Sequence, residues 1–265
     1  MLAKKKWGQH FITDKQLLQK IVALAEIEGH NVLEIGPGKG ALTQFLVKKA
    51  KKVLAYEIDK DLTSFLEPLS SLHDNLKICY QDYLTVEDDE ITKYFKGEPI
   101  TLVSNLPYNI TAPVMTKFLD AHYFTKAVLM VQKELANRIL AHPKTKDYGS
   151  FGVMIQSHAV CKKLLDVKRH LFHPSPLVDS TLILLQQTTH YCKEYNEFVQ
   201  MIFANKRKTL QNNLLNNVHL NPVFVKEVIQ SLSLKPNCRA EELAIYQIRD
   251  LFNLCQKFLN IPTQN

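Results

Sequence analysis

The stretch that decides the fold is NVLEIGPGKG, at residues 31–40. Its first half is an apolar run typical of a buried strand, and its second half is a glycine-rich turn. A helical pattern of apolar residues follows at 41–47. Glycines let a backbone approach a ligand closely, and the helix start offers unpaired N–H groups. The pattern predicts a Rossmann-like unit for a dinucleotide or another adenosine-containing cofactor.

Two details of this turn favour a cofactor that joins adenosine to an amino acid. Glu34 stands just before the glycines, where a carboxylate would repel a pyrophosphate but could pair with an ammonium group. The third glycine, Gly40, also comes one residue early for the dinucleotide fingerprint.

Acidic residues end the next two predicted strands. Glu57 closes the strand at 53–57, where doubly wound folds place a carboxylate against ribose hydroxyls, and Asp59 fits the cap of the following helix. Asp82 follows the strand at 76–80. Its carboxylate could accept a hydrogen bond from an adenine amine or could cap a helix near 87–95, and the residues alone leave these alternatives equal.

A fourth strand, at 100–104, ends on Asn105-Leu106-Pro107-Tyr108. This turn offers an amide, a stiffened backbone and an aromatic ring, which together suit a flat group that bears an amine. Taken alone, a polar turn with a tyrosine over the sheet edge explains it better. A fifth strand is expected at 127–131, and the alternation of strands and helices predicts a parallel sheet covered on both faces.

The second half of the chain departs from this alternation. The stretches 151–160 and 179–185 are predicted to form an antiparallel strand pair. Between them, prolines hold Phe172 in an irregular loop, where its ring could be free or could plug the sheet rim. From Tyr195 the pattern is helical, with one helix expected at about 195–215 that carries Lys206, Arg207 and Lys208. That basic face suits RNA phosphates, although a solvated charge cluster is the simpler explanation.

Composition limits the classes of function. The formal net charge is +7 and the pI is about 9.0, which moderately favours a polyanionic partner. No apolar run is long enough to span a membrane, and the basic N-terminus lacks the apolar stretch of a signal peptide. The five scattered cysteines fit a reducing cytoplasm and argue against a zinc site or a disulfide framework. An amphipathic helix capped by Asp14 follows the basic leader.

Several motifs together resemble the S-adenosylmethionine-dependent rRNA adenine N6,N6-dimethyltransferases, most closely the bacterial small-subunit (KsgA-type) branch. They are GQHF at 8–11, EIGPGKG at 34–40, Glu57, Gln81-Asp82, NLPY at 105–108, FHPSP at 172–176 with VDS at 178–180, and KRKTL at 206–210. They occur in the family's order and spacing. One loop departs from the family pattern, because residues 141–149 lack the glycine expected soon after Pro143.

The resemblance implies an α/β fold. It would be a Rossmann-like seven-stranded methyltransferase sheet, mostly parallel with one antiparallel strand, and a small all-helical C-terminal domain. The methyltransferase domain, with an N-terminal segment that caps cofactor and RNA, is expected at 1–190, and a helical RNA-binding domain at 191–265. No metal is implied.

The resemblance also assigns roles to residues. S-adenosylmethionine would be held by Gln9, His10, Phe11, Glu34, Gly36, Gly38, Gly40, Glu57, Ile58, Asp82 and Asn105. The target adenine would be engaged by Asn105, the Leu106 carbonyl, Tyr108 and Phe172, the last two by stacking. RNA would be bound by Lys5, Lys162, Lys168, Arg169, Lys206, Arg207 and Lys208.

The implied reaction is dimethylation of two adjacent adenosines near the 3′ end of 16S rRNA, on a pre-30S-type particle, by a cytoplasmic monomer. A large-subunit rRNA adenine methyltransferase of the macrolide-resistance type is the nearest alternative. An NAD-dependent oxidoreductase would leave the turn at 105–108 unused. A structural assembly factor that only binds RNA is a further alternative, opposed by the intact Asn105, Tyr108 and Glu57.

Overall fold

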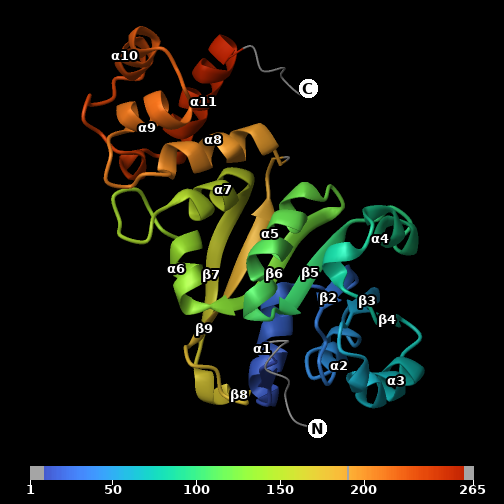
Figure 1. Cartoon of the computed structure of the whole chain (residues 1–265). Coiled ribbons are helices and arrows are strands. Elements are labelled where there is room, and N and C mark those ends of the chain that lie inside the picture. The colour runs from blue at the N-terminus through green and yellow to red at the C-terminus, as the bar shows by residue number, and fades with distance from the viewer. Residues whose placement is uncertain (1–8, 190, 260–265) are drawn as a thin grey trace. The chain divides into compact units, whose positions relative to one another are not determined.

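The structure is a computed structural model that describes residues 9–189 and 191–259. The chain divides into two compact units, one made of Met1–Ala136 and Ala159–His190 and the other of Asn137–His158 and Tyr191–Asn265. Figure 1 shows the elements in chain order. No helix in the described part of the chain is long and apolar enough to cross a membrane.

The strands are β1 (Phe11–Ile12), β2 (Asn31–Ile35), β3 (Lys52–Tyr56), β4 (Leu76–Cys79), β5 (Ile100–Asn105), β6 (Phe124–Gln132), β7 (Ala159–Val167), β8 (Phe172–His173) and β9 (Ser180–Gln187). The helices are α1 (Lys15–Ala25), α2 (Thr43–Leu46), α3 (Thr63–Leu72), α4 (Asp88–Tyr94), α5 (Thr111–Asp120), α6 (Lys133–Ile139), α7 (Ser150–His158), α8 (Lys193–Phe203), α9 (Leu210–Asn217), α10 (Pro222–Ser231) and α11 (Ile245–Leu259). Short 3-10 turns are η2 (Lys60–Leu62), η3 (Tyr83–Thr85), η4 (Tyr108–Ile110), η5 (Arg169–Leu171) and η6 (Ala240–Glu242).

The first unit holds a seven-stranded sheet in the order β4-β3-β2-β5-β6-β9-β7. The first five strands in this order, β4, β3, β2, β5 and β6, pair in parallel. Strand β9 is antiparallel to both β6 and β7. The predicted fold, mostly parallel with one reversed strand, is confirmed. A separate two-stranded ribbon joins β1 to β8, in the register Ile12↔Phe172.

Burial explains why the central strands form at these positions. Every residue of β2 is buried, as expected for a parallel strand covered on both faces. Helix α1 begins after Asp14, whose carboxylate accepts the Leu17 N–H at 2.7 Å, so the predicted cap is confirmed. The apolar stripe of α1 packs with one face of the sheet in a single core cluster that includes Leu18, Ile21, Val32, Val53, Val103 and Val128.

The pairing register of the parallel strands places their C-terminal ends side by side. Ile35 of β2 lies opposite Tyr56 of β3, so Gly36 and Glu57 emerge side by side. The Gly36 N–H donates to the Tyr56 carbonyl at 2.8 Å and continues that pairing past the strand end. The C-terminal ends of β2, β3, β4 and β5 therefore share one edge of the sheet, which is where ligands bind in such folds.

The stretch predicted as a strand at 151–160 is helix α7 followed by β7, so that prediction was wrong. Six residues of the nine-residue helix are buried: Gly152, Val153, Met154, Ile155, Ser157 and His158. A helix buried on most sides lacks the 3.6-residue alternation that distinguishes it from a strand. The antiparallel pairing with β9 is real, but it is made by Ala159–Val167.

The two units meet in sequence at His190 and Tyr191, and Asn137–His158, which the sequence analysis placed in the first domain, belongs to the helical unit. Tyr148 is fully buried there and donates its hydroxyl hydrogen bond to the Leu243 carbonyl at 2.9 Å. Ser157 and Tyr195 share another buried hydrogen bond, at 2.8 Å. These contacts join residues that are far apart in the sequence, and local patterns do not reveal them.

Two further features of the helical unit differ from expectation. The predicted helix at 195–215 is interrupted, because α8 ends at Phe203 and α9 begins after Thr209, whose hydroxyl caps it. In the loop without its expected glycine, Lys144 takes the left-handed conformation with φ +68°, which glycine adopts most easily. Its N–H donates to the Glu241 carbonyl at 2.8 Å, a contact that fixes this conformation.

Candidate functional site

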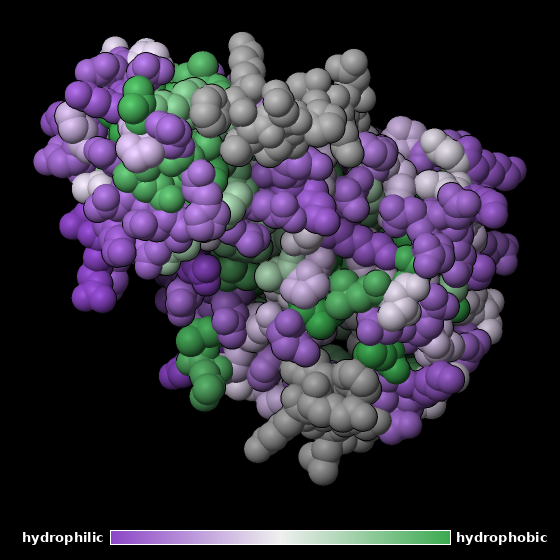
Figure 2. Space-filling view, turned by 45° about the horizontal axis from the view of Figure 1, so that its top comes forward, coloured by the Kyte–Doolittle hydropathy of each residue, from purple (hydrophilic) through white to green (hydrophobic). Residues whose placement is uncertain are grey.

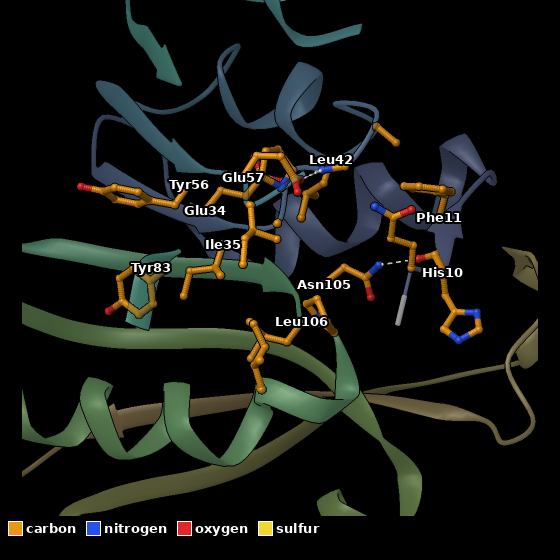
Figure 3. A pocket seen from close by; sticks show the side chains of 18 of the residues that line it. His10, Phe11, Glu34, Ile35, Leu42, Tyr56, Glu57, Tyr83, Asn105 and Leu106 are labelled. Carbon is orange, nitrogen blue, oxygen red and sulfur yellow. Dashed lines mark hydrogen bonds between the residues drawn. The ribbon is translucent and has the colours of Figure 1, made fainter. Parts of the chain in front are cut away.

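A pocket opens at the strand ends of the first unit. Among its lining residues are these predicted ones: Gln9, His10, Phe11, Glu34, Gly36, Gly38, Glu57, Ile58, Asp82, Asn105, Leu106 and Tyr108. Figure 3 shows His10 and Phe11 at one side of it, Glu34 and Glu57 at its centre, and Tyr56 and Tyr83 at the other side. The structure thus brings together residues separated by up to a hundred positions in the sequence.

The glycine turn forms one wall of the pocket. Gly36 and Gly38 both have positive φ, at +68° and +62°. A Cβ atom on Gly38 would lie 2.9 Å from Cε1 of Phe11, so a side chain there would push into the ring. Gly40 also has positive φ, but a Cβ there would face Leu69 of α3, and Gly40 is absent from the pocket lining. The prediction that Gly40 contacts the cofactor is not supported by this geometry, and its role is to close the turn.

Glu34 is a buried carboxyl group at the base of the pocket. It is 1% exposed and accepts a hydrogen bond from the Thr43 hydroxyl at 2.7 Å. Burial raises the pKa of Glu34 to about 8, the Thr43 hydrogen bond opposes this rise, and the nearby charge of Glu57 adds to it. Glu34 therefore holds a proton at neutral pH in the free protein. A cationic ligand group beside it would favour the ionised form.

Glu57 ties the glycine turn to the end of β3. One carboxylate oxygen accepts the Gly38 N–H at 3.0 Å, and the other accepts the Asp59 N–H at 2.9 Å. Burial raises the pKa of Glu57, and these two amide hydrogen bonds act against that rise. Each carboxylate oxygen has a second lone pair, so both can also accept from a ligand's hydroxyl groups. Asp59 caps η2 as predicted, and its other oxygen accepts from Gln9 Nε2 at 2.9 Å.

Asp82 caps a helical turn with one carboxylate oxygen and faces the pocket, where it could accept a hydrogen bond from an adenine amine. Its Oδ1 accepts the Leu84 N–H at 2.9 Å and so caps the 3-10 turn η3. The capped element is this turn, whereas α4 begins later, at Asp88. No described residue donates to Asp82 Oδ2, and Asp82 lines the pocket. One oxygen is thus fixed by the fold while the other remains available to an adenine amine.

Asn105 is oriented by a contact with the N-terminal segment. Its Nδ2 donates to the His10 carbonyl oxygen at 3.0 Å, which Figure 3 marks with a dashed line. Because a carbonyl can only accept, this bond fixes which end of the amide carries the NH2 group. Asn105 Oδ1 has no donor among the described residues and is free to accept from a ligand amine.

An aromatic pair lies beside Asn105. The rings of His10 and Tyr108 stack with centroids 5.7 Å apart and an interplanar angle of 29°. The Tyr108 hydroxyl is hydrogen bonded to Ser180 Oγ at 2.8 Å, and His10 Nδ1 contacts the Pro174 carbonyl at 2.7 Å. Tyr108 is therefore held firmly while one face of its ring meets an imidazole.

Phe172 is not brought to the pocket. Its side chain is 3% exposed, belongs to the core cluster beneath the sheet, and is absent from the pocket lining. Its backbone pairs with β1, so Phe172 plugs the rim of the sheet, and the expectation of a free ring is wrong for this structure. A phenylalanine followed closely by two prolines looks unconstrained in the sequence, whereas the β1–β8 pairing fixes its backbone.

The predicted RNA-binding residues lie outside the pocket. Lys162, Lys168 and Arg169 are exposed on the first unit, and Lys5 is outside the described residues. The exposed Lys206, Arg207 and Lys208 occupy the turn between α8 and α9 in the helical unit, where the interrupted helix places them at a loop.

Three polar residues at or next to the site were given no role from the sequence: Thr43, Ser180 and Tyr83. Thr43 and Ser180 are fully buried, and each holds a site side chain by a hydrogen bond. A threonine in the first turn after a glycine loop is a signal that could have been used for Thr43. Tyr83 follows Asp82 directly and lines the pocket. Ser180 is part of the VDS motif, but it lies 72 residues from Tyr108, and no local pattern reveals their contact.

The residues present fit an adenosine joined to an amino acid. Glu34 and the glycine turn suit the amino-acid end, Glu57 offers acceptors to a ribose, and Asp82 offers an acceptor beside the apolar Ile58 and Tyr83. The order of the sheet and this pocket define a Rossmann-like methyltransferase.

The chain belongs to the ribosomal RNA adenine dimethylase family, whose model matches residues 1–257. It is 40% identical over 264 residues to a ribosomal RNA small subunit methyltransferase A of Onion yellows phytoplasma (strain OY-M), covering 97% of this chain and 98% of the relative. It is 39% identical to the protein of that name from Streptococcus thermophilus (strain CNRZ 1066), covering 91% of this chain and 88% of the relative.

Two solved structures are similar along nearly the whole chain. A dimethyladenosine transferase from Plasmodium falciparum superposes with a TM-score of 0.82 at 26% identity, covering 95% of this chain and 99% of that one. The 23S rRNA methyltransferase ErmE superposes with a TM-score of 0.71 at 27% identity, covering 92% of this chain and 98% of that one.

Proposed function

We propose that this protein transfers methyl groups from S-adenosylmethionine to N6 of two adjacent adenosines near the 3′ end of small-subunit rRNA, and dimethylates each. The observation that carries the proposal is the fixed amide of Asn105 at the mouth of an adenosine-type pocket. The full-length similarity to small-subunit methyltransferases supports the choice of RNA.

The cofactor supplies an electrophilic methyl group on a sulfonium. The chain's part is to present a weak nucleophile to it, because the lone pair of an adenine amine is delocalised into the ring. In this proposal Asn105 Oδ1 accepts one N6–H, and the carbonyl of the neighbouring pocket residue Leu106 accepts the other. Acceptors on both hydrogens favour a pyramidal nitrogen whose lone pair points at the methyl carbon, so placement and polarisation provide most of the rate enhancement.

Bound S-adenosylmethionine, held by Glu34, Glu57 and Asp82 in this proposal, would supply the methyl group for the new N–CH3 bond and would keep the electron pair of its broken C–S bond. The proton on N6 leaves afterwards to water, so no strong base is needed in the pocket. A monomethylated adenine retains one N6–H for the same acceptors, which allows the second transfer. Tyr108 provides a face on which the unstacked base can lie, and this contact offsets the cost of unstacking.

The partner in this proposal is a small-subunit ribosomal particle at a pre-30S stage, approached by a cytoplasmic monomer. The exposed basic turn Lys206-Arg207-Lys208 of the helical unit supports contact with rRNA phosphates. The free cysteines of the described chain fit a reducing compartment.

The similarity to ErmE makes the large subunit the alternative substrate. Isolated small and large subunits from cells lacking the modification are incubated with the protein and labelled S-adenosylmethionine. Label in small-subunit rRNA supports the proposal. Label confined to the large subunit supports the alternative. If neither subunit is labelled although the protein binds the cofactor, the result contradicts both methyltransferase proposals and favours an assembly factor that only binds RNA.

A further inference from the structure

The loop that joins β8 to β9 presents an exposed leucine. Leu177 is 91% exposed, the highest value among the exposed large apolar side chains of the described residues, and Val178 beside it is 42% exposed. Figure 2 shows a face that is largely hydrophilic, on which apolar atoms reach the surface in separate small patches. A single exposed leucine is ordinary on a protein surface, so the way the loop holds it decides its meaning.

Hydrogen bonds on both sides hold the loop in place. The Arg169 guanidinium donates to the Leu177 carbonyl at 3.1 Å, and the Arg169 N–H donates to Asp179 Oδ1 at 3.0 Å. Lys168 bonds the other Asp179 oxygen at 3.0 Å, and Ser175 Oγ donates to the Arg169 carbonyl at 2.9 Å. The Leu177 backbone is therefore fixed, with its side chain directed into solvent.

The same contacts bring the cationic side chains of Lys168 and Arg169 to the loop, together with the Asp179 carboxylate that pairs with Lys168. Lys168 and Arg169 are both exposed and are adjacent in the chain. An apolar tip between cationic side chains fits a nucleic acid, because the cations meet phosphates while the apolar side chain inserts between bases. It fits a protein or lipid surface less well, because neither offers stacked bases, flanked by backbone phosphates, between which a side chain can insert.

The loop starts at the base-binding part of the site. Pro174 accepts from His10, whose ring stacks on Tyr108, and β8 pairs with β1 next to that contact. Leu177 is three residues beyond Pro174, so their Cα atoms are at most about 11 Å apart. Leu177 therefore belongs to the same short loop as Pro174, the residue whose carbonyl holds His10 beside Tyr108.

We propose that Leu177 is a wedge that enters the rRNA stack where the target adenine leaves it. This inference rests on the proposed function. The wedge replaces the stacking partner that the neighbouring base loses, and Lys168 and Arg169 hold the flanking phosphates while it does so. It acts on the RNA and on no reacting atom, so Leu177 is a positioning residue.

The test uses the full chain and a small-subunit rRNA hairpin with 2-aminopurine at the target position, whose fluorescence rises on unstacking. With S-adenosylhomocysteine present and no methyl transfer needed, wild type is expected to raise the fluorescence. Leu177→Ala is expected to bind the hairpin but to lose most of the rise, and Leu177→Met to restore it. Leu72→Ala, at a leucine 78% exposed on α3 near the opposite edge of the sheet, is the matched control and should behave as wild type.

Turnover separates the wedge from general RNA binding. For the folded hairpin, Leu177→Ala should lower kcat/KM about tenfold, because the free energy needed to unstack the target base is no longer offset by contact with the leucine. For an unpaired oligonucleotide carrying the same adenines, kcat/KM should not change. An equal loss on both RNAs, or a wild-type fluorescence rise in Leu177→Ala, overturns the wedge. Wild type that unstacks the base of the hairpin yet transfers no methyl group to unmodified small-subunit particles overturns the proposed function instead.

Discussion

Replacing Glu34 with glutamine should change how the stability of the cofactor-free protein depends on pH. The pKa of Glu34 is about 8 in the folded state, against 4.5 for an ordinary glutamate. Between these values the folded protein keeps a proton that the unfolded chain releases, so stability falls as pH rises through this window. The full shift corresponds to a loss of about 5 kcal/mol in the free energy of unfolding between its two ends.

The assay is urea unfolding followed by circular dichroism, for wild type and Glu34→Gln, at several pH values from about 4.5 to about 8.5, a range chosen to bracket the two pKa values. At the acid end, both proteins carry a neutral group that accepts from Thr43, and their stabilities should be close. At the alkaline end, wild type must ionise a buried carboxyl, and the glutamine variant should be more stable by several kcal/mol. Parallel profiles for the two proteins would refute the assignment of a buried, protonated Glu34.

The same protonation should be visible in cofactor binding. If Glu34 pairs with the ammonium of S-adenosylmethionine, binding at neutral pH must release the Glu34 proton. Calorimetry in buffers of different ionisation enthalpy would detect this as a buffer-dependent heat for wild type. The heat for Glu34→Gln should not depend on the buffer in this way, and an unchanged dependence would place the ammonium elsewhere.

Three other substitutions test the remaining parts of the site. Asn105→Ala should keep the affinity for S-adenosylmethionine in calorimetry but lose most methyl transfer, and transfer at the wild-type rate would remove Asn105 from the N6 contact. Glu57→Ala should weaken cofactor binding by about 1.5–3 kcal/mol, because ribose acceptors are lost and the Gly38 and Asp59 amides lose their partner; an unchanged Kd would contradict this. Charge reversal at Lys206, Arg207 and Lys208 should weaken binding to the ribosomal particle and flatten its salt dependence, with cofactor affinity as the control. Equal salt slopes for both proteins would show that this turn does not meet phosphates.

The sequence predicted pocket-lining residues where a polar side chain stands at or next to the end of a strand. Glu34, Glu57, Asp82 and Asn105 each stand at or just past a predicted strand end, and parallel strands place such ends at one edge. The role of each residue was ambiguous when it was taken alone. A shared ligand site could be inferred only because all four strand ends were expected at the same edge of the sheet. The glycine turn could also be predicted from the sequence, because backbone positions with positive φ favour glycine.

Features set by distant contacts were not predictable in this way. Helix α7 was mistaken for a strand because it is buried on most of its surface and shows no period. The same segment joins the helical unit through the hydrogen bond of Tyr148 to Leu243, 95 residues away. The sequence left the Phe172 ring either free or buried, and the structure pairs its backbone with Ile12 and buries its ring in a core cluster. In each case the deciding partner lies far along the chain.

Dimethylation of adjacent adenosines in small-subunit rRNA can be measured directly by mass spectrometry of that rRNA, after unmodified particles are incubated with the protein and S-adenosylmethionine. We expect two adjacent N6,N6-dimethyladenosines near the 3′ end, and we expect both to be absent when Asn105→Ala is used. Methyl groups at any other position, or on another base, would contradict it.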